Sequence, residues 1–128
     1  PSFRLPTISG SHVALEDLRG RRVLLFFFAP WCKVCDLSIS NLNWVKKLSG
    51  EESVALFAVA LSYKDLQSVE SFLERNALEV PVILGTPELL DSYRIRAFPT
   101  VYALNESGEI DGSTVGYTTT LGLWWRTL

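Results

Sequence analysis

The chain has 128 residues, of which 48% are hydrophobic and 20% are charged. This composition fits one compact domain and excludes a disordered chain or a coiled coil. The net charge of −2 shows none of the basic excess that nucleic-acid-binding domains carry, and the longest apolar run, Val23 to Ala29, is far shorter than the ~20 residues that span a bilayer.

Hydrophobic patterns along the chain predict alternating strands and helices. The continuous apolar run Arg22–Phe28 is typical of a central strand buried on both faces, and a helix is expected from about Cys32 to Leu48. The later elements are expected at Ser53–Leu61 (strand), Asp65–Ala77 (helix), Val82–Leu84 (strand), Pro87–Tyr93 (helix), Thr100–Leu104 and Glu109–Val115 (strands), and Thr119–Leu128 (helix). This order predicts an α/β domain with a mixed sheet, in which crossover helices link the first strands and a hairpin joins the last two.

The first long helix carries apolar residues near the helical period. They are Val34, Leu37, Trp44, Val45 and Leu48. We expect Trp44 to lie on the face of this helix that packs against the core.

The two cysteines of the chain, Cys32 and Cys35, are separated by two residues. A disulfide between them would close a very small loop and add little stability. A chemical role therefore explains the pair better than a role as a stabilising cross-link. The pair lies where a strand ends and a helix begins, and a helix N-terminus favours a thiolate at the first cysteine, with Lys33 adding a cation beside it. The pattern predicts Cys32 as the nucleophile and Cys35, one turn further on, as the thiol that resolves a mixed disulfide.

Metal binding is the main alternative for such a pair. A structural zinc site takes four ligands, and the single histidine, His12, could join the cysteines only as a third Cys or His ligand. We expect His12 to be a loop residue, and we expect no bound cofactor. Cu(I) can be held by two thiolates, so a copper site at Cys32 and Cys35 stays open.

Two motifs resemble those of the thioredoxin superfamily: residues 31–35 are Trp-Cys-Lys-Val-Cys, and residues 98–100 are Phe-Pro-Thr. The resemblance implies a thioredoxin-like fold, with a central mixed sheet flanked by helices on both faces. It also implies that Pro99 is a cis-proline lying against the redox pair and that the backbone of Phe98 is free to pair with a substrate strand. Trp31 would form a substrate-docking patch together with Phe98.

The two residues between the cysteines, Lys33 and Val34, replace the Gly-Pro of thioredoxin. In this superfamily these positions tune the reduction potential. Lys33 is expected to stabilise the thiolate, and hence the reduced form, which makes the disulfide more oxidising.

Within the superfamily, the chain resembles the TlpA/ResA branch of bacterial extracytoplasmic thiol–disulfide oxidoreductases. The likeness is carried by residues 11–20, 57–61, 80–82 and 91–100, and the ending at 116–125 looks closest to ScsD, the suppressor-of-copper-sensitivity member. The resemblance implies a periplasmic enzyme that exchanges its dithiol or disulfide with protein thiols and disulfides and is recycled by a membrane or periplasmic redox partner. Two alternatives use the same cysteine pair: a Cu(I)-binding copper-tolerance protein and a reductant for apocytochrome c maturation.

The chain contains no Met and begins at Pro1. We therefore expect that an upstream segment has been removed, which could be a signal peptide, a membrane anchor or only a few residues. The length predicts that residues 1–128 form a single thioredoxin-like domain, and the resemblance implies that the missing piece was an N-terminal signal or membrane anchor.

The sequence also departs from the thioredoxin pattern. Thioredoxin has a buried Asp six residues before its first active-site cysteine, and here that position is Phe26, in the run 26–28 that is expected in the core. Asp65 is a candidate replacement as proton acceptor, although an Asp at the start of a helix is more often its N-cap.

Overall fold

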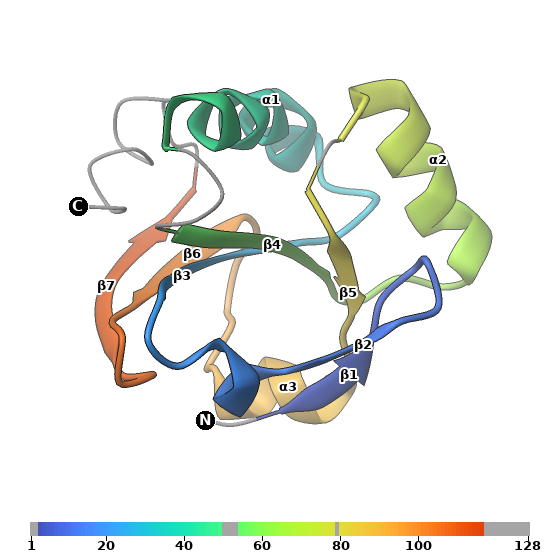
Figure 1. Cartoon of the computed structure of the whole chain (residues 1–128). Helices are drawn as coiled ribbons and strands as arrows, with labels where there is room; N and C mark the ends of the chain where they lie inside the picture. The colour runs from blue at the N-terminus through green and yellow to red at the C-terminus, as the bar shows by residue number, and fades with distance from the viewer. Residues whose placement is uncertain (1–2, 50–53, 79, 117–128) are drawn as a thin grey trace.

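A five-stranded sheet lies at the centre of the computed structural model, which describes residues 3–49, 54–78 and 80–116 (Figure 1). Its strand order is β5-β4-β3-β6-β7, and the strands are β3 (Arg22–Phe28), β4 (Val54–Ala60), β5 (Val82–Leu84), β6 (Thr100–Leu104) and β7 (Ile110–Val115). Strands β3, β4 and β5 are parallel, whereas β6 is antiparallel to β3 and β7 is antiparallel to β6. The predicted mixed sheet with a terminal hairpin is confirmed.

Helices cover both faces of this sheet, as Figure 1 shows. Helices α1 (Lys33–Ser49) and α2 (Leu66–Asn76) lie on one face, and α3 (Pro87–Ser92) lies on the other. For the helices and strands that were predicted within the described residues, the observed bounds differ from the expected ones by no more than one residue at either end. The hydrophobic period and the capping residues are therefore sufficient to place these elements.

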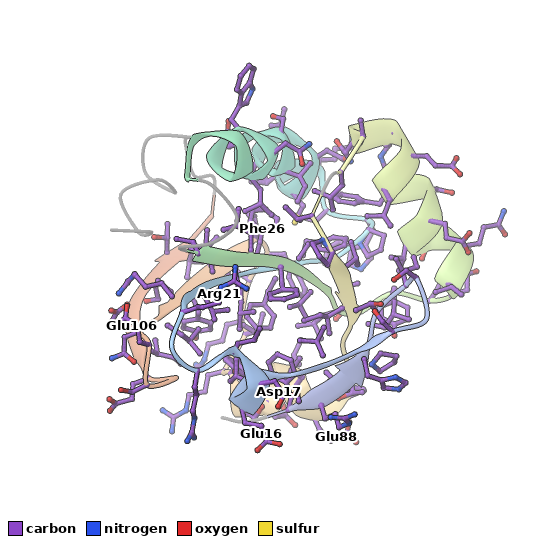
Figure 2. All side chains as sticks on the ribbon, viewed as in Figure 1. Glu16, Asp17, Arg21, Phe26, Glu88 and Glu106 are labelled. Atoms are coloured by element: carbon purple, nitrogen blue, oxygen red, sulfur yellow. The ribbon has the colours of Figure 1, made fainter. Side chains whose placement is uncertain are left out.

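Strand β3 divides the core into two layers because alternate side chains point to opposite faces. Phe26 and Phe28 join the apolar cluster beneath α1 and α2, whereas Phe27 joins the cluster on the side of α3. All three rings are fully buried, which confirms the expectation for residues 26–28. Figure 2 shows Phe26 on the side of the sheet that faces α1.

The expectation that Trp44 lies on the core face of α1 is wrong. Trp44 is 56% exposed and Leu37 is 66% exposed. Among residues 33–44 of α1, whose side chains are described, the buried ones are instead Cys35, Ser38, Ile39 and Leu42. These residues share one stripe of the helix, and the stripe is turned toward the sheet, where Cys35, Ile39 and Leu42 join the same apolar cluster as Phe26 and Phe28.

The first twenty residues contain structure that the hydrophobic pattern did not predict. Strands β1 (Arg4–Pro6) and β2 (His12–Ala14) pair with each other, and a short 3-10 helix, η1, covers Leu15–Leu18. His12 is therefore in a strand and not in a loop, and its side chain is exposed. The predicted helix at 119–128, and residues 117–125 of the ending that resembles ScsD, lie outside the described residues. Within the described residues, no helix has both the length and the hydropathy needed to cross a bilayer.

Candidate active site

Cys32 lies in the turn between β3 and α1. The N–H of Cys32 donates to the carbonyl of Ala29 (3.1 Å), and the N–H of Asp36 donates to the carbonyl of Cys32 (3.3 Å), which closes the first helical turn. The backbone N–H of Cys35 points at Cys32 Sγ, at 3.2 Å. The sulfur thus takes the place of an N-cap oxygen, and negative charge on it is stabilised by this N–H and by the helix N-terminus.

Cys35 is enclosed by the core. It is 0% exposed, in the same cluster as Phe26 and Phe28, whereas Cys32 is 7% exposed. Burial raises the pKa of the Cys35 thiol far above its ordinary value, and its hydrogen bond with Cys32 acts in the same direction. Cys35 is therefore a protonated thiol at neutral pH, and Cys32 is the sulfur that a reactant meets first.

The loop before β6 lies against Cys32. Its Phe98–Pro99 peptide bond is cis, as expected. The thiol of Cys32 donates to the carbonyl of Phe98 at 3.6 Å, although the two residues are 66 positions apart. The Thr100 hydroxyl donates to the carbonyl of Ala97 (2.7 Å), and this bond closes the loop on itself.

Trp31 is on the surface beside Cys32, and its side chain is 66% exposed. Its ring meets that of Phe98 edge to face, with centroids 5.7 Å apart, as expected for a joint patch. The indole N–H donates to the carbonyl of Ser62 (2.9 Å). A hollow of about 280 Å³, lined by residues 61–63 and 85–87 together with Leu90, begins at this same Ser62.

Lys33 and Val34 are exposed at the start of α1. Their influence on the reduction potential stays a prediction.

Asp65 is the N-cap of α2. Its carboxylate accepts a hydrogen bond from the backbone N–H of Ser68 at 2.9 Å, and the side chain is exposed. The expectation that Asp65 caps a helix is confirmed. A carboxylate that is committed to a cap in solvent is a poor candidate to receive the proton of a buried thiol.

The Asp65→Ala variant is expected to lose about 1 kcal/mol of unfolding free energy, because α2 would lose its cap. The Asp65→Asn variant keeps an oxygen that caps and should be as stable as the unmodified chain. Urea unfolding measures both effects. We expect both variants to exchange disulfides at the unmodified rate, and slower exchange by Asp65→Asn at unchanged stability would identify the carboxylate as the proton acceptor.

The structure adds residues that the sequence pattern missed. The Arg75 guanidinium, from α2, donates to the carboxylate of Asp36 (Nε–Oδ1 2.9 Å, Nη2–Oδ2 3.3 Å) and to the carbonyl of Pro30 (2.8 Å). Asn76 donates to the same carboxylate at 2.7 Å. Arg75 is 39 positions from Asp36, so no local spacing could have indicated this contact.

Among the residues that the structure describes, no three His, Cys, Asp or Glu side chains form a group that could hold a metal ion. The arrangement at Cys32 and Cys35 suits disulfide chemistry, since Cys32 keeps a small exposed area (7%) and a second thiol, that of Cys35, stands within the same helical turn.

Comparison with known proteins gives one family and a consistent set of relatives. The sequence profile of the AhpC/TSA family matches residues 1–113. The chain is 32% identical over 120 residues to the thioredoxin-like protein YneN of Bacillus subtilis, covering 91% of this chain and 69% of YneN. It is also 32% identical over 117 residues to the sporulation thiol-disulfide oxidoreductase A of the same organism, covering 89% of this chain and 70% of that protein. ResA of Geobacillus kaustophilus is 31% identical over 111 residues, covering 86% of this chain and 63% of ResA.

Solved structures agree with these relatives. StoA from Bacillus subtilis superimposes with a TM-score of 0.88 at 30% identity, covering 100% of this chain and 97% of that one. A thiol:disulfide interchange protein of the thioredoxin family from Chlorobium tepidum gives 0.87 at 25% identity, covering 99% and 91% of the two chains. The thioredoxin-like fold expected from residues 31–35 and 98–100 is confirmed.

Proposed function

Because the chain belongs to the AhpC/TSA family and is a thiol–disulfide oxidoreductase of the ResA and StoA type, we propose that Cys32 and Cys35 are its redox pair. Cys32 is the nucleophile and Cys35 is the resolving thiol. The observation that carries this assignment is the contrast between the two sulfurs. Cys32 is 7% exposed beside the exposed Trp31, and its sulfur accepts the Cys35 N–H at 3.2 Å, whereas Cys35 is 0% exposed and enclosed by the core.

The reaction has two steps in the reductive direction. The Cys32 thiolate attacks one sulfur of a substrate disulfide; that S–S bond breaks, a bond forms between Cys32 and the substrate, and the departing sulfur takes a proton. Cys35 then loses its proton and attacks Cys32 Sγ, and the second substrate sulfur leaves and is protonated. The substrate gains two electrons and two protons, and the enzyme is left with a Cys32–Cys35 disulfide. Oxidation of a substrate dithiol is the reverse.

The substrates are protein thiols or disulfides, and we propose that they dock on Trp31 and Phe98. The paired rings present an apolar surface directly beside Cys32. The carbonyl of Phe98 lies within 3.6 Å of the nucleophilic sulfur, so a substrate strand that pairs with Phe98 would hold its own sulfur close to Cys32.

The Trp31→Ala variant is expected to reduce insulin disulfides with a KM about tenfold higher, because an exposed indole of this kind contributes about 1 to 2 kcal/mol to an interface. Its reaction with oxidised glutathione, which is too small to cover the patch, should stay within about twofold of the unmodified rate. Trp31→Phe keeps an aromatic surface and serves as the control. An equal loss with both substrates would mean that Trp31 acts on Cys32 itself and not on docking.

The proposal is tested first by equilibrating the protein with glutathione buffers at neutral pH. A reduction potential near roughly −270 mV would identify a donor of electrons to disulfides, and one near roughly −120 to −180 mV would identify an oxidant or isomerase of its clients. A pair that does not equilibrate would overturn the proposal. Cu(I) binding by the two thiolates would then become the leading function, and it is measured by titrating the reduced protein with Cu(I).

The location and partners belong to the same proposal. Residues 1–128 form one thioredoxin-like domain that works in the periplasm, held by an N-terminal anchor and recycled by a membrane or periplasmic redox protein, as the resemblance to the TlpA/ResA branch implies. Thiols of apocytochrome c are one class of client that this chemistry suits.

A further inference from the structure

We propose that Arg75 is a positioning residue for the thiol chemistry: it braces both ends of the redox motif and offsets the charge of Asp36, so that negative charge can form on Cys32. The proposal rests on the proposed function, since it concerns the same cysteine pair.

The side chain of Arg75 contacts residues on both sides of the redox motif. Arg75 donates through Nη2 to the carbonyl of Pro30 (2.8 Å), and through Nε and Nη2 to the two carboxylate oxygens of Asp36 (2.9 and 3.3 Å). Pro30 stands two residues before Cys32, and Asp36 directly follows Cys35. The guanidinium therefore ties the loop that enters the motif to the helical turn that leaves it.

The guanidinium is itself held by the core. Its Cζ lies 5.1 Å from the ring centroid of Phe72, and that ring stacks on Phe28 with centroids 4.5 Å apart. Asn76 supplies a third side-chain donor to Asp36 and also bonds to the carbonyl of Phe72 (3.0 Å). The Arg75 side chain is 47% exposed, and its contact with the buried aromatic pair limits the orientations that its planar guanidinium can adopt.

The charge that Arg75 offsets belongs to a residue that lies one helical turn from Cys32 and next to Cys35 in the chain. The hydrogen bond from Asp36 N–H to the Cys32 carbonyl closes one helical turn, so Asp36 and Cys32 are neighbours at the i and i+4 positions. The charge of Asp36 also contributes to the raised pKa of Cys35, after burial and the hydrogen bond with Cys32. A carboxylate in this place opposes thiolate formation unless a cation offsets it.

Asp36 is charged at neutral pH. Partial burial pushes its pKa upward, but hydrogen bonds from Arg75 and Asn76 and the charge of Arg75 outweigh this effect and hold the pKa below its usual range. The charged side chains of the surrounding elements include Asp36 and the exposed Lys33 on α1, and Arg75 on α2. The loop before β6 supplies the carbonyl of Phe98 and carries the exposed Arg96 two residues before it.

The test is the rate at which iodoacetamide alkylates Cys32 in the reduced protein, followed from about pH 5 to 9. Cys35 is fully buried, so the first alkyl group attaches at Cys32, and peptide mass confirms the position. In Arg75→Gln we expect the rate on the acidic limb of the profile to fall about threefold to tenfold, because the unpaired carboxylate opposes the thiolate. Adding Asp36→Asn to this variant removes that carboxylate and should restore the rate to within about twofold.

A second Arg–Asp pair provides the matched control. Arg22 at the start of β3 donates to Asp111 through both terminal nitrogens (3.0 and 3.1 Å), about 20 Å along the strand from the motif. Arg22→Gln should leave the alkylation profile unchanged. The inference is overturned if Arg75→Gln keeps the acidic limb of the unmodified protein. A loss that Asp36→Asn does not restore would overturn the charge effect and leave Arg75 as a brace of the loop alone. Failure of the unmodified protein to equilibrate with glutathione would instead overturn the proposed function.

Discussion

The Cys35→Ser variant is expected to accumulate a stable mixed disulfide between Cys32 and its protein substrate. The first step needs only the sulfur of Cys32 and survives in this variant, whereas release needs a second thiol, which a serine hydroxyl cannot replace. One adduct per chain should appear on non-reducing gels and disappear with dithiothreitol.

The Cys32→Ser variant is expected to lose disulfide reduction by more than about 10³-fold, since the nucleophile is gone and Cys35 is enclosed. The double variant Cys32→Ser/Cys35→Ser is the control for non-covalent association and should form no adduct. Adduct formation by Cys32→Ser and not by Cys35→Ser would show that the two roles are reversed.

The Phe28→Ala variant is expected to lose about 3 to 5 kcal/mol of unfolding free energy, which is a large part of the roughly 5 to 15 kcal/mol of an ordinary domain. The Phe28 ring is fully buried in the central strand and stacks on Phe72 of α2, so its removal leaves a cavity between sheet and helix. Urea unfolding of the reduced protein, followed by tryptophan fluorescence, measures the loss as a lower midpoint at an unchanged slope.

Two control variants test whether the loss of stability is specific to removal of the buried Phe28 ring. Phe28→Leu fills most of the space and should cost less than about 2 kcal/mol. Leu37→Ala removes an apolar side chain that is 66% exposed on α1, and should change stability by less than about 0.5 kcal/mol. A Leu37→Ala cost as large as that of Phe28→Ala would contradict the observed orientation of α1.

The orientation of α1 shows where a local pattern stops being sufficient. Val34, Leu37 and Trp44 recur near the helical period and correctly predict a helix, yet all three are exposed. Periodicity shows that a stripe exists, but a helix with apolar residues on more than one side can be docked in more than one rotation. Packing against the sheet selects one rotation of the helix, in which the buried side chains are Cys35, Ser38, Ile39 and Leu42.

In the candidate site, too, some features could be predicted from nearby residues and others could not. The pair Cys32 and Cys35 and its place at a helix start follow from positions 32–35, and the cap at Asp65 follows from one residue and its helix. The approach of Phe98 to Cys32, across 66 positions, was expected only through the resemblance to a known superfamily. The contact of Arg75 with Asp36 was not expected at all.

The sequence by itself determined the strands and helices from Arg22 to Val115, the α/β class with its mixed sheet, and the place of the cysteine pair at a helix start, because these depend on side-chain period and on neighbours within a few residues. Only the tertiary structure decided which face of α1 is buried, which cation meets Asp36, and how the pairing of β1 with β2 places His12 in a strand. These features depend on contacts between distant segments. Their free energy is gained only when the sheet brings those segments together, and no local pattern records it.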